Sequence, residues 1–225
     1  MNSIMSLSFT KEALRRLSRR SRRKKFELLE QVFRPRPEDR VLDVGASGAT
    51  FTPYTFQDYY AYPDRLVAGG IERREILEAR RRYPRAQYAI FDGRALPFPD
   101  KSFDLVFSNA VIEHLPSRGQ QERFAQEVRR VGRSWFITTP NYWFLFESHY
   151  HLPFIHFLPR EAQRWYNRLL GTHIPKGRVA ELALLSARQM RKLFPGSRVV
   201  PMRVTFWPET LVALYMDPSR GARSG

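Results

Sequence analysis

The chain has 225 residues, of which 43% are hydrophobic and none is cysteine, and its 38 Lys and Arg against 22 Asp and Glu give a formal net charge of +16. This length can bury one substantial core, so we expect a single domain over residues 1–225. The lack of cysteine excludes disulfides, thiolate metal sites and a cysteine nucleophile. No apolar run approaches the ~20 residues of a transmembrane helix, and no signal peptide is visible, so we expect a cytoplasmic protein.

Half of the net charge lies in one segment near the start of the chain. Residues 11–25 hold nine basic residues and one acid, a net charge of +8. Apolar residues at helical spacing, among them Leu14, Leu17 and Phe26, predict a helix that docks on the domain from about residue 10. We therefore assign residues 1–39 to a basic N-terminal helical segment. Its basic face suits solvent, peripheral contact with an anionic membrane surface, or RNA or DNA; we favour nucleic acid least.

The stretch from Val41 to Thr50 joins an apolar run, an acid and a loop of small residues. That order predicts a buried strand that ends in a tight turn before a helix. Gly45 and Gly48 let the backbone approach a ligand closely and offer free N–H groups. Open α/β sheets bind nucleotide-like ligands at such loops.

Four more apolar stretches follow, each ending in polar residues or proline. They are residues 66–72, 88–93, 103–109 and 134–140, with helical patterns at 73–83 and 120–131 between them. Strands that alternate with helices predict an α/β fold with a parallel sheet and helices on both faces. Further on, Ser186 and Gln189 form a capping box at a helix start, and two strands are expected at 197–207 and 209–216, around Pro208.

Four blocks of sequence carry a resemblance to a known family: VLDVGASGA, GGIE, FDGRALPFPDKSFDLVFSNAVIEHL and ITTPN. From about Arg40 to Asp217 the chain resembles class I S-adenosylmethionine-dependent methyltransferases of the small-molecule type. The resemblance implies a three-layer sandwich, with a mostly parallel seven-stranded sheet and a C-terminal antiparallel hairpin. It implies S-adenosyl-L-methionine as cofactor, a binding core at 40–140, and a helix and hairpin at 186–217. The tail at 218–225 is expected to be disordered, since terminal residues often lack order.

The expected cofactor contacts follow the ends of the strands. A carboxylate after the second strand can accept both ribose hydroxyls, and one after the third can accept from the adenine amino group. The residues assigned to the cofactor are Asp43, Gly45, Ala46, Ser47, Gly48, Glu72, Arg73, Asp92, Gly93, Ser108 and Asn109. Glu72 is assigned to the ribose, Asp92 to the adenine, and Asp43 to the ammonium group through water. Each acid also has a structural alternative: Asp43 as a helix cap, Glu72 as a solvated first-turn acid and Asp92 in an Asp-Gly turn.

The glycine loop differs from the family pattern. Ser47 and Ala49 stand where the family has glycine, and Gly48 is added. Small residues are kept, so the backbone can still approach the cofactor closely. The change leaves open a non-catalytic protein that only binds S-adenosylmethionine.

Residues 112–115, Ile-Glu-His-Leu, resemble the loop after the fourth strand of ubiquinone- and menaquinone-type methyltransferases. The resemblance implies that His114, with Glu113, serves as general base for an acceptor hydroxyl, since a histidine pKa lies near neutral pH. The alternative is that the pair only caps the loop. Some quinone enzymes hold a metal through a glutamate at the position of Ala110, so we predict no such metal site.

Residues 141–185 are expected to form a lid over the acceptor. Its first twenty residues hold seven aromatic residues and three histidines. Such a lid excludes water and suits a flat aromatic or a lipidic small molecule, although plain packing on the core is the alternative. The expected polar contacts to the acceptor are Tyr142, His149, Tyr150 and His151. A nucleic-acid acceptor is less favoured, because the Pro-Pro-aromatic motif of base N-methyltransferases is missing after the fourth strand.

Overall fold

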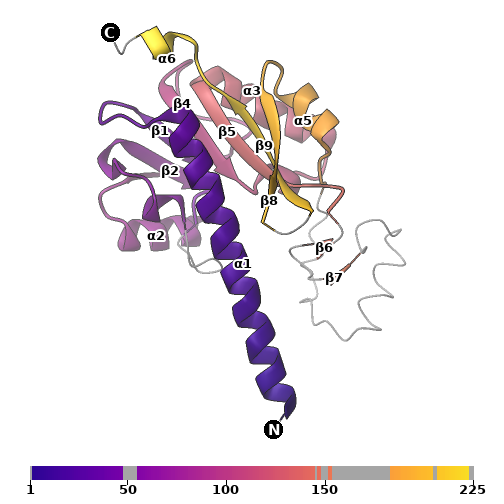
Figure 1. Ribbon diagram of the computed structural model, residues 1–225. Coiled ribbons are helices and arrows are strands. Elements are labelled where there is room, and N and C mark those ends of the chain that lie inside the picture. The colour runs from indigo at the N-terminus through magenta and orange to yellow at the C-terminus, as the bar shows by residue number, and fades with distance from the viewer. Residues whose placement is uncertain are drawn as a thin grey trace.

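The computed structural model describes residues 2–47, 55–144, 146–147, 152–153, 183–204 and 207–222, and it shows a twisted sheet with helices on both faces (Figure 1). The sheet has seven strands in the order β3-β2-β1-β4-β5-β9-β8. They are β1 (Val41–Val44), β2 (Leu66–Gly70), β3 (Gln87–Ile90), β4 (Phe103–Asn109), β5 (Gly132–Pro140), β8 (Arg198–Arg203) and β9 (Pro208–Tyr215). The strands β6 (Phe146–Glu147) and β7 (Leu152–Pro153) pair with each other in a separate two-stranded sheet.

The strand order reverses between β1 and β4. Strands β1 to β3 run outward to one edge in parallel, and the chain then returns to place β4 beside β1, also in parallel. The β9 strand pairs antiparallel with both β5 and β8. The predicted fold class, a mostly parallel sheet with a C-terminal antiparallel hairpin, is confirmed. In such sheets ligands bind at the carboxyl ends of the strands, where the order reverses.

Two apolar layers sandwich the sheet, because successive side chains of a strand point to opposite faces. On one face, α1 (Asn2–Phe33) and α2 (Arg73–Arg82) pack against side chains that include Val41 and Phe107. On the other, α3 (Arg118–Val131) and α5 (Ala187–Leu193) pack against side chains that include Leu42 and Val106. Both faces of the central strands are thus buried, as their continuous apolar runs predict.

Short 3-10 helices adjoin the strands: the first follows β1, the second leads into the start of β2 and the third follows β4. They are η1 (Phe56–Asp58), η2 (Pro63–Arg65) and η3 (Ile112–His114). The capping box of Ser186 and Gln189 at the start of α5 is confirmed. The α1 helix begins eight residues before the expected residue 10. The strand expected at 197–207 ends at Arg203, where a register shift occurs.

The prediction of a disordered tail from residue 218 is wrong over its first part. Residues Ser219–Ala222 form the helical turn α6. Arg220 anchors the turn: its guanidinium makes an ion pair with the buried Asp39, donates to the carbonyl oxygen of Phe33 at 2.8 Å, and lies over the Phe33 ring at 3.7 Å. Composition alone did not reveal this partner, because Asp39 lies 181 residues earlier.

The α1 helix continues past the carboxyl edge of the sheet. Its C-terminal part lies on the sheet, whereas its N-terminal half projects beyond the strands (Figure 1). Its 32 residues give a length of roughly 48 Å, well beyond the length of a strand. Among the described residues, no helix combines the length and the apolar character that crossing a bilayer requires.

Candidate functional site

The loop after β1 is held tightly against neighbouring loops. The backbone N–H groups of Gly45 and Ala46 both donate to the carbonyl oxygen of Gly69, at 2.8 and 3.0 Å. Gly45 has a φ of +94°, and a Cβ there would lie 2.2 Å from Cγ2 of Val111. Only glycine fits this position, both for its backbone angle and for the space. Close approach of the backbone is used here by the neighbouring loop that holds Val111. The prediction of a free N–H group at Gly45 is wrong, because this N–H donates to Gly69.

Ser47 and Ser108 both have hydrogen-bond partners within the protein. Ser47 Oγ donates to Glu75 of α2 at 2.8 Å, and Gly48 lies outside the described residues. The hydroxyl of Ser108 is fully buried and donates to the carbonyl oxygen of Val44 at 2.8 Å. Ser108 therefore joins the ends of β1 and β4, which are the two walls of the predicted cofactor site.

Asp43 is a carboxyl group placed inside the protein. It is 4% exposed, and Gln57 Nε2 of η1 donates to its Oδ2 at 3.1 Å. Burial raises the pKa of Asp43 to about 7, and the hydrogen bond from Gln57 only partly opposes this effect. A buried carboxylate without a charged partner is costly, and a cation that entered the site would relieve that cost. The position therefore suits the ammonium group assigned to it. Gln57 could not be predicted as the partner of Asp43, since residues 51–65 follow no clear periodicity in the sequence.

Glu72 and Arg73 stand where β2 leads into α2. Glu72 is the N-cap residue of the helix, makes no side-chain cap bond, and is exposed. Arg73 opens the helix and is exposed as well. An exposed carboxylate at the end of β2 is accessible to a ribose, and it also matches the alternative of a solvated first-turn acid.

Asp92 is paired with a residue that the sequence analysis did not single out. Arg94 Nε donates to Oδ1 at 2.9 Å and Arg94 Nη2 to Oδ2 at 2.5 Å, while the Asp92 side chain stays 35% exposed. These bonds lower the pKa of Asp92, so it is ionised at neutral pH. A Cβ at the neighbouring Gly93 would lie 2.8 Å from the Phe124 ring. Asp92 thus builds a local turn and also offers an accessible carboxylate at the end of β3.

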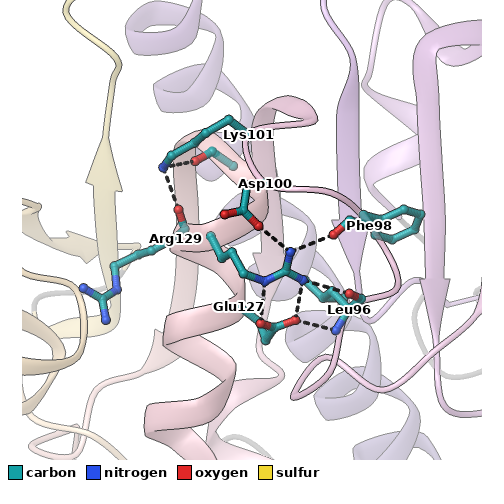
Figure 2. Close-up of polar contacts among 8 residues, drawn as sticks. Leu96, Phe98, Asp100, Lys101, Glu127 and Arg129 are labelled. Carbon is teal, nitrogen blue, oxygen red and sulfur yellow. Dashed lines mark hydrogen bonds and ion pairs between the residues drawn. The ribbon is translucent and has the colours of Figure 1, made fainter.

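The loop that follows Asp92 is fastened to α3 (Figure 2). Arg130 pairs with Glu127 and Asp100 and donates to the carbonyl oxygens of Leu96 and Phe98 at 2.9 and 2.8 Å. Glu127 in turn accepts from the backbone N–H of Leu96 at 2.7 Å. Lys101 donates to the carbonyl oxygens of Arg129 and Gly132. This cluster fixes the loop, and through it the place of Asp92 and Gly93.

Asn109 closes β4 and meets a lysine from α1. Lys25 Nζ donates to Asn109 Oδ1 at 2.9 Å, and Thr138 Oγ1 of β5 donates to the same oxygen at 2.8 Å. Lys25 was treated as one of many basic residues in its segment. Its spacing did carry a signal, because Lys25 precedes Leu29 by four residues and Phe33 by eight, so it lies on the helix face that packs on the sheet.

Glu113 and Asn109 face the interior, whereas His114 does not. Glu113 is 0% exposed and accepts from Thr139 Oγ1 at 3.1 Å. His114 ends η3 and is exposed at the same edge of the sheet. The structure therefore separates the two residues that the sequence analysis grouped as one catalytic pair, with a buried carboxyl group and an accessible imidazole.

Of the predicted acceptor contacts, Tyr142 alone lies within the described residues. It is half-buried just after β5, and its ring meets that of Trp143 edge to face at 5.0 Å. His149, Tyr150 and His151 lie outside the described residues. Within the described ranges, no three side chains of His, Asp or Glu gather into a metal-binding group.

Known proteins resemble the chain in both sequence and fold. Residues 42–134 match the family model described as a methyltransferase domain. A Mycobacterium tuberculosis protein named "probable S-adenosylmethionine-dependent methyltransferase" is 35% identical over 80 residues, which are 34% of this chain and 28% of that protein. The chain covers less than a third of the length of the curated relatives that it matches, 17% to 28%.

Solved structures extend the likeness to the whole fold. A Pyrococcus horikoshii protein superposes with a TM-score of 0.58 at 20% identity, over 88% of this chain and 90% of that one. Haemonchus contortus phosphoethanolamine N-methyltransferase 2, solved with S-adenosyl-L-methionine, gives a TM-score of 0.54 at 16% identity, over 80% of this chain and 38% of that one. Residues 42–134 thus match a methyltransferase domain in sequence, and the whole sheet shares its fold with these solved structures.

Proposed function

We propose that this chain transfers a methyl group from S-adenosylmethionine to a hydroxyl oxygen of an aromatic or lipidic small molecule. The observation that carries the proposal is the order of the acids along the carboxyl edge of the sheet. Asp92 follows β3, Glu72 follows β2, and Asp43 lies one residue before the end of β1, beside the point where the strand order reverses. This order matches the adenine, ribose and methionine parts of the cofactor in turn.

The residues at this edge fit the cofactor. Gly45 lets the loop after β1 lie close against the loop that holds Val111, and Asp43 is a buried carboxyl group whose charge a cation would compensate. When bound, S-adenosylmethionine supplies a methyl group on a positively charged sulfur, which a nucleophilic oxygen can attack. The Gly45 loop would lie under the methionine part, and Ser108 and Asn109 would form the opposite wall.

The chain's main contribution to the reaction is to place the acceptor. Alignment of two reactants within near-contact distance accounts for a large share of enzymatic rate acceleration. His114 is exposed at the edge after β4, so it can take a proton from an acceptor hydroxyl, as we propose for it. Tyr142 and the aromatic lid would shield the acceptor from water. The ubiquinone- and menaquinone-type likeness of residues 112–115 favours an aromatic hydroxyl.

The basic residues of α1 favour a methyl acceptor that lies at an anionic membrane surface. Arg19, Arg20 and Arg23 are exposed on α1, the helix that continues past the carboxyl edge of the sheet (Figure 1). Residues 11–25 would therefore bring the site to an anionic membrane. Co-sedimentation with vesicles of phosphatidylglycerol in phosphatidylcholine at low salt tests this contact, and binding should fall steeply with salt. Equal binding to vesicles of phosphatidylcholine alone would contradict it.

The first experiment is calorimetric titration with S-adenosylmethionine and S-adenosylhomocysteine. Wild-type protein should bind both, and Asp92→Ala should bind them at least tenfold more weakly, because the adenine loses its acceptor. If S-adenosylmethionine binds, the next step is a screen of hydroxylated acceptors with a radiolabelled methyl donor. No binding of either ligand would overturn the proposal. Tight binding without transfer to any acceptor, including RNA, would instead indicate a cofactor-binding protein without catalysis.

A further inference from the structure

Lys25 is a cation that the fold places inside the protein. It lies on the face of α1 that packs on the sheet, next to Phe26, and it is 8% exposed. Its ammonium group reaches the carboxyl edge of the sheet, where it donates to Asn109 at the end of β4. Lysines on surface helices normally extend their ammonium groups into water. Lys25 directs its ammonium group to the end of a central strand instead.

The burial of this ammonium is not balanced by an ion pair. Within the part of the chain that the structure describes, no carboxylate lies within ion-pair distance of Lys25, and the bond to Asn109 is to a neutral amide oxygen. An ammonium has three N–H donors, so two more acceptors can be served. Burial lowers the pKa of Lys25 to about 8. A methionine would fill the same space without this cost, so a purely structural role accounts poorly for lysine here.

The strand order puts Lys25 beyond the cofactor. The acids assigned to S-adenosylmethionine follow β3, β2 and β1, and the next strands in the sheet are β4 and β5. Asn109 ends β4, and its register partner Thr138 lies in β5. Both residues bond through the Asn109 oxygen that Lys25 contacts, so the ammonium group lies at the ends of β4 and β5. It therefore stands on the side of β1 away from Asp92, where the methyl group is passed on and the acceptor binds.

Charges of both signs surround Lys25. Arg22, one turn earlier on α1, disfavours its protonated form, whereas Glu113 of η3 and Glu209 of β9 favour it. The two carboxylates act at a distance and keep the ammonium protonated near neutral pH. An anion placed directly on Lys25 would supply the missing partner.

We propose that Lys25 binds an oxyanion of the methyl acceptor, a carboxylate or a phosphate that lies apart from the hydroxyl to be methylated. This assignment rests on the proposed function and narrows its substrate class to anionic acceptors. Lys25 is then an anion-binding residue, and Asn109 and Thr138 orient its ammonium group. The negative charge of the acceptor would then attract the positively charged sulfonium of the cofactor.

The test uses the full-length protein saturated with S-adenosylhomocysteine, so that the cofactor half of the site is occupied. Benzoate and phenyl phosphate are titrated by ligand-observed NMR, with benzamide as the neutral probe of matched shape. Lys25→Met should bind both anions at least tenfold more weakly and leave benzamide and S-adenosylhomocysteine unchanged. Lys25→Arg should retain much of the anion binding. Arg123→Met, which removes an exposed cation of α3, should bind as wild type does.

Thermal unfolding separates this role from a structural one. If Lys25 serves a ligand, Lys25→Met removes an uncompensated buried charge and should unfold at a higher temperature than wild type at pH 7. That gap should narrow between pH 8 and pH 10, since the wild-type lysine loses its proton in this range. A lower unfolding temperature for Lys25→Met, with unchanged anion binding, would assign Lys25 to structure and overturn the proposal.

The anion could belong to a free metabolite or to a lipid headgroup, and vesicles distinguish the two. Loss of phosphatidylglycerol vesicle binding in Lys25→Met, with no effect on soluble anions, would identify the lipid headgroup. The reverse pattern would identify a soluble acceptor. If Lys25→Met changes neither vesicle binding nor the binding of soluble anions, the role assigned to Lys25 fails although the proposed function stands. If wild-type protein does not bind S-adenosylhomocysteine at all, both fail together.

Discussion

Gln57 donates a hydrogen bond of 3.1 Å to the carboxyl group of Asp43, which lies buried at the end of the first strand. The two residues come from β1 and from η1, in a stretch without clear periodicity. Burial raises the pKa of Asp43 to about 7, so this group titrates in the physiological range. The charge of the ionised carboxylate is therefore poorly compensated within the protein, which is the basis of the ligand role that we propose for Asp43.

Asp43→Asn should weaken binding of S-adenosylhomocysteine and stabilise the ligand-free protein at neutral pH. The folded pKa lies about three units above the unfolded one, so the folded state binds more protons and wild-type stability falls as pH rises from about 4 to 7. The loss is at most about 4 kcal/mol, and Asn avoids it while it keeps the bond from Gln57. Urea unfolding at pH 5 and pH 8 measures the difference, and parallel pH profiles for the two proteins would contradict it.

Ligand affinity should depend on pH in the opposite sense. Binding of an ammonium group favours the ionised form of Asp43, so the affinity for S-adenosylhomocysteine should increase between pH 5.5 and pH 8. Calorimetry in buffers of different ionisation enthalpy would detect the proton released on binding. Asp43→Asn should lose both the slope and the proton release. A wild-type affinity that is constant over this range would show that another group receives the ammonium.

Gly45→Ala should destabilise the protein by about 2–5 kcal/mol, because it adds both left-handed backbone strain and a clash with Val111. The double variant Gly45→Ala with Val111→Ala removes the clash and keeps the strain, so it should recover only part of the loss. Chemical denaturation of the single and double variants separates the two terms. Full recovery in the double variant would mean that the backbone angle is unimportant.

Arg130→Met should loosen the loop from Leu96 to Asp100 and lower stability by about 1–3 kcal/mol. The effect should be largest above pH 5 and shrink in acid, because Arg130 lowers the pKa of Glu127, and this contribution is lost as Glu127 becomes protonated. Amide hydrogen exchange should speed up at Leu96, whose N–H binds Glu127. Arg123→Met, an exposed cation of the same helix, should leave both readouts unchanged.

Arg94→Met should leave the Asp92 carboxylate in place and remove its ion pair with Arg94. If Asp92 binds the adenine amino group, affinity for S-adenosylhomocysteine should stay equal or increase severalfold, whereas Asp92→Asn should lose affinity. The pKa of Asp92 should rise in Arg94→Met, as NMR titration would show, since Arg94 is the main cause of its lowered value. A loss of affinity in Arg94→Met as large as that in Asp92→Asn would mean that the pair serves as a unit.

His114→Ala should lower methyl transfer, whereas Glu113→Ala should lower the stability of the protein. His114 is exposed, so its loss should lower methyl transfer at least tenfold with cofactor binding and stability unchanged. Glu113 is buried against Thr139, so its loss leaves a buried hydroxyl without its acceptor and should cost about 1–3 kcal/mol of stability. Transfer assays and thermal unfolding separate the two. Equal loss of cofactor affinity in His114→Ala would contradict its role as base.

The sequence predicted the fold because local signals and sheet topology agree here. Apolar strands that end in Asp43, Glu72 and Asp92 mark the carboxyl edge directly. Pairings across long separations were not predictable. Lys25 and Asn109 are 84 residues apart, and the charge of the surrounding segment hid a lysine at a buried helical position. Arg94 was missed for a different reason. Its partner Asp92 is only two residues away, but the sequence pattern assigned Asp92 to the adenine and not to an ion pair.

The ion pair of Arg220 with Asp39 also bears on how the chain is made. Asp39 leaves the ribosome 181 residues before its partner, a delay of roughly 10–40 s at about 5–20 residues per second. Over that time the junction of α1 and β1 lacks its cation, and β5 lacks β9 as a neighbour. Chains that stop early would expose Phe33 and an open sheet edge, both of which favour aggregation. We therefore expect the segment up to β5 to be prone to aggregation until β9 and Arg220 have been synthesised.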